Sequence, residues 1–409
     1  MLDHVDVGLV DFRSYEPYVS SELSQEIRSL ARGLKGARVA QVNATPYGGG
    51  VSELLRSLVP MYKGLGIKAD WKVISGDPSF FSVTKSFHNA LQGAPGELTS
   101  LAGETYLTYN KLNADLLDEE YDFLIIHDPQ PLAIRHFKGS SNAKWVWRCH
   151  IDTSHPNKEV LAFLLPYFTE YNAVVFTMDQ FVPPALEHPK LAIIPPAIDP
   201  ISPKNMELGE KICRHILTWL GVNPQQPLLT QVSRFDPWKD PMGVIEVYRR
   251  VRREVPGLQL AMIASMALDD PEGWEIHKQV TEETKGDDDI HVRTNLVGVS
   301  DVEVNAFQRM SQVIMQKSIR EGFGLVISES LWKGTPVVAN RAGGIPLQMG
   351  DGVGGFLVDD TEQAVDRILY LLRHPKEAAA MGRAGRGRVR ERFLMPRLLA
   401  DELRLLASL

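Results

Sequence analysis

The chain has 409 residues, of which 44% are hydrophobic and 23% are charged, as in a folded globular protein. Its length predicts two domains of roughly 150–200 residues each. The net charge of -7 at pH 7 argues against nucleic acid or an anionic membrane as a partner.

The cysteine content and the apolar pattern indicate in which cellular compartment the protein works. Cys149 and Cys213 are too few for a disulfide framework or a metal cluster, which favours a reducing environment. The first residues, MLDHVDVGLVDF, lack the basic region before an apolar run that marks a secretory signal. Because no apolar segment approaches the ~18 residues that span a bilayer, we expect a soluble, cytoplasmic protein.

Short apolar segments alternate with amphipathic ones through the first half of the chain. Continuously apolar segments are typical of strands in a parallel sheet that is covered on both faces. The predicted strands are residues 37–43, 122–127, 144–150 and 172–177. A helical pattern at residues 51–66 ends on Gly64 and Gly66. The alternation predicts a parallel sheet flanked by helices.

The same alternation begins again after residues 194–205, IPPAIDPISPKN, whose four prolines predict a hinge. The predicted strands of the second half are residues 227–233, 258–264, 312–316 and 335–340, and the predicted helices are residues 241–255, 302–310 and 325–334. After Thr361 the patterns are helical. We therefore expect an α/β protein with two doubly wound domains that face a central cleft.

Gly48, Gly49 and Gly50 follow the first predicted strand and precede a helix. Glycines at such a position let the backbone approach a ligand, and the helix N-terminus offers amide groups to negative charge. The triplet does not match the G-x-G-x-x-G pattern of dinucleotide sites. A tight strand-to-helix turn explains it equally well.

Two cations, Arg234 and Lys239 in SRFDPWKD, come directly after the predicted strand 227–233. Open α/β sheets bind ligands at the carboxyl ends of their strands. Arginine offers phosphate oxygens a flat fork and lysine a point charge. These residues predict a site for a diphosphate, and the alternative is a pair of solvated loop cations.

Glu321 lies at another predicted strand-to-helix junction, in the segment EGFGLVISE. Gly322 and Gly324 permit a close turn, so that the amides of residues 322–325 would point at a ligand. A carboxylate there suits sugar hydroxyls or positive charge developing on a sugar ring. Glu329, within the first two turns of the helix, would touch another part of an extended ligand. The alternative, a first-turn carboxylate favoured by the helix dipole, accounts for one glutamate but not for both.

Polar side chains also gather at predicted strand and helix ends of the first half. His150 and Asp152 end the strand 144–150 and should face the cleft, where functional and structural roles weigh about equally. The same question arises for His88, Asn89, His127 and Asp128. For HDPQP (127–131) the alternative is that proline ends the strand.

No metal site is predicted. Asp287 and Asp289 have a D-x-D spacing, but their acidic, polar surroundings favour a solvated loop. The sequence contains no H-E-x-x-H, cysteine cluster, P-loop or G-x-S-x-G pattern.

The segment EGFGLVISE resembles the E-x7-E signature of retaining glycosyltransferases with two Rossmann-like domains, the GT-B fold. Arg234 and Lys239 match the phosphate-binding pair of that family. Six shorter segments look like those of trehalose glycosyltransferring synthases: GGVSELLRSLV, SFHNALQG, HDPQP, WRCHID, SRFDPWKD and DDPEGW (269–274). The similarity spans Ala37 to Glu391 and leaves residues 1–36 without an assigned role.

The resemblance implies that glucose passes from a nucleoside-diphosphate-glucose to free glucose, giving α,α-1,1-linked trehalose in a reaction that can be reversible. The donor would be UDP-, ADP- or GDP-glucose, with no cofactor required. The partners would be these small molecules, and a homodimer is compatible with the sequence.

The domains would be residues 1–196 for the acceptor and 197–375 for the donor, and residues 376–409 would pack back on the first domain.

The resemblance also implies roles for individual residues. Glu321 would contact the donor sugar, Glu329 the ribose, and Arg234 and Lys239 the diphosphate. Gly49 and Gly50 would approach the donor phosphates from the first domain, and His150 would lie near the anomeric centre. The donor turn would comprise Gly322, Phe323, Gly324 and Leu325, and the residues that position acceptor glucose would be His88, Asn89, Asp128 and Asp152.

Because no residue stands out as a nucleophile, we expect the acceptor to attack from the face that the diphosphate leaves. One rival is a trehalose phosphorylase that uses inorganic phosphate. Another is a transferase for a sugar phosphate, which would need a basic cluster in the first half. A silent sugar-nucleotide sensor would be expected to lack Glu321, Arg234 or Lys239, and a nicotinamide oxidoreductase is disfavoured by the missing glycine pattern.

Overall fold

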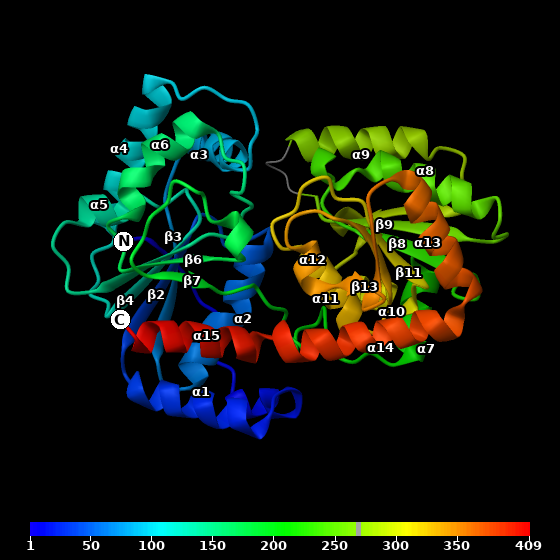
Figure 1. Ribbon diagram of the computed structural model, residues 1–409, viewed down its shortest axis with the longest axis horizontal. Coiled ribbons are helices and arrows are strands. Elements are labelled where there is room, and N and C mark those ends of the chain that lie inside the picture. Colours follow the sequence, from blue (N-terminus) through cyan, green and yellow to red (C-terminus); the bar gives the residue numbers. More distant parts are fainter. Residues whose placement is uncertain (267–270) are drawn as a thin grey trace. The chain divides into compact units, whose positions relative to one another are not determined.

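The computed structural model describes residues 1–266 and 271–409, and these form two units. The first unit comprises Met1–Ala197 and Met395–Leu409, and the second comprises Ile198–Leu394 (Figure 1). The division falls inside the proline-rich segment 194–205. Asp269 and Asp270, in the predicted segment DDPEGW, lie outside the described residues.

The first unit is built on a seven-stranded sheet in the order β1-β3-β2-β4-β5-β6-β7. The edge strand β1 runs antiparallel to β3, and the remaining neighbours are parallel. The chain order therefore reverses between β2 and β4, a place where such sheets bind ligands. The strands are β1 (Asp3–Val5), β2 (Arg38–Asn43), β3 (Lys68–Val73), β4 (Phe123–His127), β5 (Lys144–Arg148), β6 (Ala173–Phe176) and β7 (Leu191–Ile193).

Helices cover both faces of this sheet. The helix α2 contacts β2 and β3, and α15 packs on α2 and lies beside α1 (Figure 1). The helices α3, α4 and α6 contribute to a core on the other face. The helical elements are η1 (Phe12–Tyr18), α1 (Ser21–Gly33), α2 (Gly50–Gly64), α3 (Pro78–Leu91), α4 (Ser100–Leu116), α5 (Ile134–Lys138), α6 (Lys158–Phe168), η2 (Asp179–Phe181) and α15 (Met395–Ala407).

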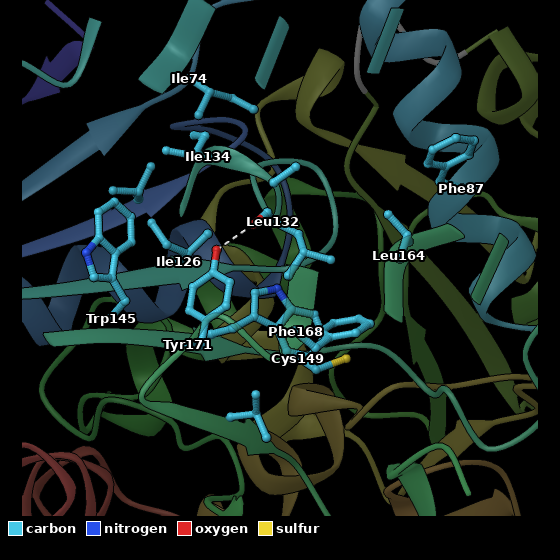
Figure 2. Packing of buried hydrophobic residues seen from close by; sticks show 14 of the residues in the cluster. Ile74, Phe87, Ile126, Leu132, Ile134, Trp145, Cys149, Leu164, Phe168 and Tyr171 are labelled. Carbon is cyan, nitrogen blue, oxygen red and sulfur yellow. Dashed lines mark hydrogen bonds between the residues drawn. The ribbon is translucent and has the colours of Figure 1, made fainter. Parts of the chain in front are cut away.

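Aliphatic and aromatic side chains together fill that core (Figure 2). Ile126 of β4 and Trp145 of β5 point into it and are fully buried. The hydroxyl of Tyr171 donates to the carbonyl oxygen of Leu132 at 2.6 Å, so the buried phenol keeps a partner (Figure 2). Tight packing on this face fixes the carboxyl ends of β4 and β5, where the candidate residues of this unit lie.

The second unit also has a seven-stranded sheet, in the order β10-β9-β8-β11-β12-β14-β13, and its strands are parallel. The chain order reverses between β8 and β11. The strands are β8 (Leu228–Val232), β9 (Gln259–Ala264), β10 (Ile290–Thr294), β11 (Val313–Gln316), β12 (Val337–Asn340), β13 (Gly350–Asp351) and β14 (Gly354–Val358).

Two cores enclose this second sheet. Side chains from α8 and α13 pack on one face, and side chains from α7 and α10 pack on the other. The sheet is therefore doubly wound, as predicted. The helical elements are α7 (Glu210–Trp219), η3 (Pro237–Lys239), α8 (Pro241–Arg252), α9 (Pro271–Glu283), η4 (Asn295–Val297), α10 (Asp301–Met310), α11 (Leu325–Trp332), α12 (Ile345–Gln348), α13 (Thr361–Arg373) and α14 (Pro375–Arg392).

The end of the chain differs from the prediction that residues 376–409 pack on the first domain. The helix α14 packs on α11 and β14 and belongs to the second unit, whereas α15 belongs to the first. Glycines explain the docking of α14: a Cβ on Gly382 would lie 1.8 Å from the carbonyl oxygen of Gly334. A Cβ on Gly385 would lie 2.8 Å from the Cα of Gly354. The return to the first unit therefore begins at Met395.

Among the described residues, no helix is both long enough and apolar enough to cross a membrane.

Candidate active site

The donor-side candidates lie where the chain order of the second sheet reverses. The segment from Ser233 to Lys239 follows β8, and the segment from Lys317 to Gly324 follows β11. Because β8 and β11 are parallel neighbours, both segments leave the sheet at its carboxyl edge. The topology therefore brings together two motifs that stand 82 residues apart.

An ion pair forms the centre of this site. The Nζ of Lys239 lies 2.7 Å from the Oε2 of Glu321, and the hydroxyl of Ser318 donates to the same oxygen at 3.2 Å. The two charged side chains are 15% and 11% exposed. A mostly buried carboxylate and ammonium in direct contact hold each other in place and remain within reach of a ligand.

Arg234 lies apart from this pair. Its side chain is 59% exposed, and its Nη2 lies 3.4 Å from the Oδ2 of Asp236. The described contacts do not join it to Lys239 or Glu321. Of the two cations predicted for a diphosphate, one is therefore enclosed and paired, and the other is exposed.

The start of α11 has two backbone amides with no partner among the described residues. Gly324 is the N-cap of α11 with φ of 79°, a left-handed conformation, and it makes no side-chain cap hydrogen bond. The side-chain amide of Gln348 donates to the carbonyl oxygens of Phe323 and Gly324, which fixes the turn from behind. The amide of Ile327 donates to the carbonyl oxygen of Gly324, and the amide of Ser328 donates to the Oε1 of Gln348. The amides of Leu325 and Val326 are therefore the ones available to a negatively charged group.

A second glycine turn, which the sequence analysis missed, supports the first. The amide of Gly344 donates to the carbonyl oxygen of Gly322 at 2.8 Å. A Cβ on Gly343 would lie 1.6 Å from the carbonyl oxygen of Glu321. The available signal was the segment AGG (342–344) after the predicted strand 335–340, since paired glycines at a strand end often permit such an approach.

Glu329 is separate from the ion pair. It is 2% exposed, it accepts from the Nε2 of Gln308 at 3.1 Å, and its Oε1 lies 3.8 Å from the Nζ of Lys204. The two glutamates of E-x7-E thus occupy different surroundings, one in the loop and one on the helix. Their contacts with a sugar and a ribose remain predictions.

In the first unit, the glycine turn has the geometry expected of a close backbone approach. Gly48 and Gly49 have φ of 65° and 119°. Gly49 is the N-cap of α2, which begins at Gly50, and no side chain caps this helix. A Cβ on Gly48 or Gly49 would meet no atom within 4 Å, so backbone conformation, not crowding, requires glycine here.

Three predicted residues meet at the carboxyl ends of β4 and β5. The Nδ1 of His127 lies 2.8 Å from the Nε2 of His150, and the Oδ1 of Asp128 accepts from the amide of His150 at 2.8 Å. Asp128 has φ of 63°. Burial lowers the pKa of both histidines well below its usual value, and the charge of Arg148 acts in the same direction. Burial also raises the pKa of Asp128 to about 7.

The remaining first-unit candidates lie on separate elements. His88 and Asn89 are partly exposed residues in the last turn of α3. The Oδ1 of Asp152 accepts from the amide of Ser154 at 3.0 Å, so this carboxylate also shapes its own loop. Their proposed contacts with an acceptor remain predictions.

Sequence analysis missed the residues behind the two histidines. The Oε1 of Gln41 lies 2.6 Å from the Nε2 of His127, and the Nε2 of Gln41 donates to Glu402 of α15. Arg148 pairs with the same carboxylate. The available signal was a glutamine and an arginine inside otherwise apolar strands, since buried polar groups need partners.

The pair Asp287 and Asp289 binds the guanidinium of Arg252. The described part of the chain contains no group of three histidine, cysteine or acidic side chains that could hold a metal ion.

Two family models match the chain. Residues 41–183 match the N-terminal domain of trehalose synthase, and residues 219–388 match the glycosyl transferases of group 1. Each match lies within one of the two units.

Individual relatives extend over the whole chain. A trehalose synthase of Rubrobacter xylanophilus is 50% identical and covers 100% of this chain and 99% of its own. A trehalose phosphorylase of Pleurotus pulmonarius is 28% identical and covers 85% of this chain and 54% of its own.

A solved structure has the same architecture. An α,α-trehalose-phosphate synthase from Burkholderia xenovorans, in complex with glucose 6-phosphate, matches with a TM-score of 0.72 at 16% identity, over 91% of this chain and 100% of that one. This likeness shows the predicted GT-B fold. With half of all residues shared along its full length with a trehalose synthase, the chain belongs to the trehalose synthase family of glycosyltransferases.

Proposed function

We propose that the chain transfers glucose from a nucleoside-diphosphate-glucose to free glucose and makes trehalose with retention at the anomeric carbon. The observation that carries the proposal is the ion pair of Lys239 and Glu321 beside the glycine turn at the start of α11, where the amides of Leu325 and Val326 have no partner among the described residues. This arrangement suits a sugar diphosphate, and the full-length relative that is 50% identical is a trehalose synthase. No metal or cofactor is required.

The second unit would stabilise the departing diphosphate. Lys239 supplies a mostly enclosed positive charge, Arg234 an exposed one, and the amides of residues 322–325 a partial positive charge at the helix start. When the bond from C1 to the phosphate oxygen breaks, the electron pair leaves on that oxygen. Glu321 holds Lys239 in position and faces the positive charge that develops on the sugar.

The acceptor would attack C1 from the face that the diphosphate leaves. The acceptor hydroxyl oxygen forms the new bond to C1, and its proton passes to the leaving phosphate oxygen. His150 and Asp128 are candidates for positioning acceptor glucose, because both lie at the carboxyl edge of their sheet. His88, Asn89 and Asp152 are further candidates, and Glu329 is the candidate for the ribose.

The nearest rival function is phosphorolysis, because a trehalose phosphorylase is also a relative. The two functions differ in the co-substrate that releases glucose from trehalose. Purified protein is incubated with trehalose and either UDP, ADP, GDP or inorganic phosphate, and free glucose is measured. The proposal predicts release with at least one nucleoside diphosphate and none with phosphate. Release that depends on phosphate alone would refute it.

The acceptor is tested in the forward direction. Each nucleoside-diphosphate-glucose is incubated with glucose or with glucose 6-phosphate, and the products are separated. The proposal predicts a neutral disaccharide from glucose. A product formed with glucose 6-phosphate alone would assign the chain to the sugar-phosphate transferases instead.

A further inference from the structure

A chain of buried hydrogen bonds joins the C-terminal helix α15 to the ring of His150. Glu402 of α15 receives three donors: Nη1 of Arg148 lies 2.7 Å from Oε2, while Nε2 of Gln41 (2.6 Å) and the hydroxyl of Tyr62 (2.9 Å) donate to Oε1. Glu402, Gln41 and Arg148 are each 3% exposed or less. In its ion pair with Arg148, the carboxylate can only accept hydrogen bonds.

This carboxylate sets the orientation of the Gln41 side chain. The side-chain amide has one donating end and one accepting end. The opposite orientation would place the Oε1 of Gln41 against a carboxylate oxygen, which leaves two acceptors with no hydrogen between them. Gln41 therefore turns its NH2 group to Glu402 and its Oε1 to the Nε2 of His127, at 2.6 Å.

The orientation of Gln41 then fixes the hydrogen on each histidine ring. Nε2 of His127 faces an acceptor, so it carries the hydrogen. A neutral imidazole has a single N–H, and therefore Nδ1 of His127 is an acceptor. Nε2 of His150 lies 2.8 Å from that acceptor and must carry the hydrogen in turn. Burial beside Arg148 keeps both rings neutral by lowering the pKa of each.

We infer that Glu402 is a positioning residue that acts through Gln41 and His127 and holds His150 as the tautomer with hydrogen on Nε2 and a lone pair on Nδ1. His150 is partly exposed, and no hydrogen bond among the described residues involves its Nδ1. This nitrogen is thus the part of the ring that is left for a ligand.

The inference rests on the proposed function for the identity of that ligand. A bare Nδ1 accepts hydrogen from a hydroxyl and cannot donate to an anionic oxygen. His150 would therefore bind a sugar hydroxyl and take no part in neutralising the diphosphate. The C-terminal helix, far from the site in sequence, would determine which kind of group His150 recognises.

The tautomer is measured directly in the full chain without substrate. The protein is labelled with 15N-histidine, and the ring nitrogens are correlated with the carbon-bound ring protons near neutral pH. The signals of His150 are identified among the eleven histidines by their absence in His150→Gln. We expect hydrogen on Nε2 in both His127 and His150. Hydrogen on Nδ1 of His150, or a charged ring, would overturn the inference.

Two variants test the role of the buried carboxylate. Gln41→Leu cuts the link to His127 and keeps Glu402 with Arg148 and Tyr62, whereas Tyr62→Phe removes another buried hydrogen bond to the same oxygen. We expect Tyr62→Phe to keep the tautomer and Gln41→Leu to give a mixture of both forms at His150. An unchanged tautomer in Gln41→Leu contradicts the inference. If Gln41→Leu does not fold, the tautomer of His150 measured in the unmodified protein still tests the inference.

Kinetics provide a second readout. One misdirected neutral hydrogen bond is expected to lower kcat about two- to tenfold in Gln41→Leu, with the KM for the donor unchanged. An equal loss in Tyr62→Phe would indicate a merely structural role. The tautomer measurement needs no substrate, so its outcome and that of the trehalose assays are independent.

Discussion

Lys239 and Glu321 balance each other's charge before any donor arrives. Their side chains are 15% and 11% exposed, and the contact between them is 2.7 Å. Without Glu321, the mostly buried ammonium of Lys239 would have neither a partner nor full hydration. Without Lys239, the carboxylate of Glu321 would repel a diphosphate. The ion pair therefore lets Lys239 stay charged in a mostly buried position with a small desolvation penalty. The donor phosphates would compete with Glu321 for the ammonium group.

Under the proposed function, Lys239→Met is expected to lower kcat about 100-fold, because it removes an enclosed charge that would stabilise the leaving group. The donor dissociation constant should rise as well. Lys285→Met, a change of an exposed lysine in the same unit, is the matched control and should leave both constants unchanged. Steady-state kinetics and donor titration measure the two effects. Equal kinetics in both variants would remove Lys239 from the donor site.

The carboxyl group of Asp128 gives the first unit a pH-dependent stability. Burial raises its pKa from 3.8 to about 7, against the opposing effects of the His150 amide and of Arg148. The folded state thus binds the proton more tightly than the unfolded chain. The free energy of unfolding therefore falls as pH rises from about 4 to about 7, by up to about 4 kcal/mol.

Asp128→Asn should abolish this fall, because asparagine cannot ionise, keeps an acceptor for the His150 amide and tolerates φ of 63°. Thermal unfolding is followed for both proteins at about pH 5 and about pH 8. The unmodified protein should lose more stability than the variant between the two conditions. Parallel losses would show that Asp128 ionises normally.

At the scale of elements, a second glycine turn holds the donor turn in place. The turn after β12 touches the backbone of the turn after β11, with Gly343 in the left-handed region at φ of 48°. A side chain there is strained by its conformation and also collides with the carbonyl oxygen of Glu321. The position of Glu321 therefore depends on Gly343, a residue that has no side chain.

Gly343→Ala should therefore reduce transfer, because the new Cβ must displace Glu321. Gly352→Ala is the matched control: Gly352 has φ of 82° but open space around its Cβ position. Strain of the left-handed conformation should cost each variant about 1 kcal/mol of stability, and the collision with the Glu321 backbone adds to this cost in Gly343→Ala. Only Gly343→Ala should lower kcat. Activity lost equally in both variants would show that strain, not the displacement of Glu321, is responsible.

Apolar strands were predictable, and mixed ones were not. The runs at residues 37–43 and 312–316 are buried on both faces, and continuous apolar character identifies such strands. β3, KADWKV, carries charges because its neighbour on one side is the edge strand β1, and β14 begins with two glycines that admit close neighbours. Both therefore escaped a search for apolar runs.

Candidate site residues were predictable where a short sequence motif contained both the functional side chain and the turn or strand end that positions it. Glu321 and Lys239 stood beside glycines and strand ends, and the structure places them in contact. The hydrogen bonds that support His127 were not predictable, because its partner Gln41 is held in turn by Glu402, 361 residues away, and the two meet only through the fold. A polar residue in a buried strand indicates that it has a hydrogen-bond partner, but the sequence does not indicate which residue that partner is.

At the scale of the whole molecule, the first unit is completed by the end of the chain. The helix α15 contributes nine buried residues, including Leu398, Leu399 and Leu403, and the partner of buried Arg148. The second unit, by contrast, is one continuous segment, Ile198–Leu394. The two ends of the second unit, Ile198 and Leu394, form a bridge, so the adjoining ends of the first unit, Ala197 and Met395, also lie close together.

Residues 198–394 should consequently fold alone, and residues 1–197 should not, because an apolar face and an unpaired buried arginine are left behind. The control joins residues 1–197 to 395–409 through a short glycine–serine linker. Near-ultraviolet circular dichroism and thermal unfolding compare the three fragments. Cooperative unfolding of 1–197 alone, at the midpoint of the linked fragment, would show that α15 is dispensable.

The proposed reaction is tested most directly by the structure of its product. Nucleoside-diphosphate glucose labelled with 13C at C1 is incubated with unlabelled glucose, and the disaccharide is examined by NMR. The proposal predicts label at one anomeric carbon of a non-reducing disaccharide with both centres in the α configuration. A reducing disaccharide, a labelled β centre, or no disaccharide with any of the three nucleotides would contradict it.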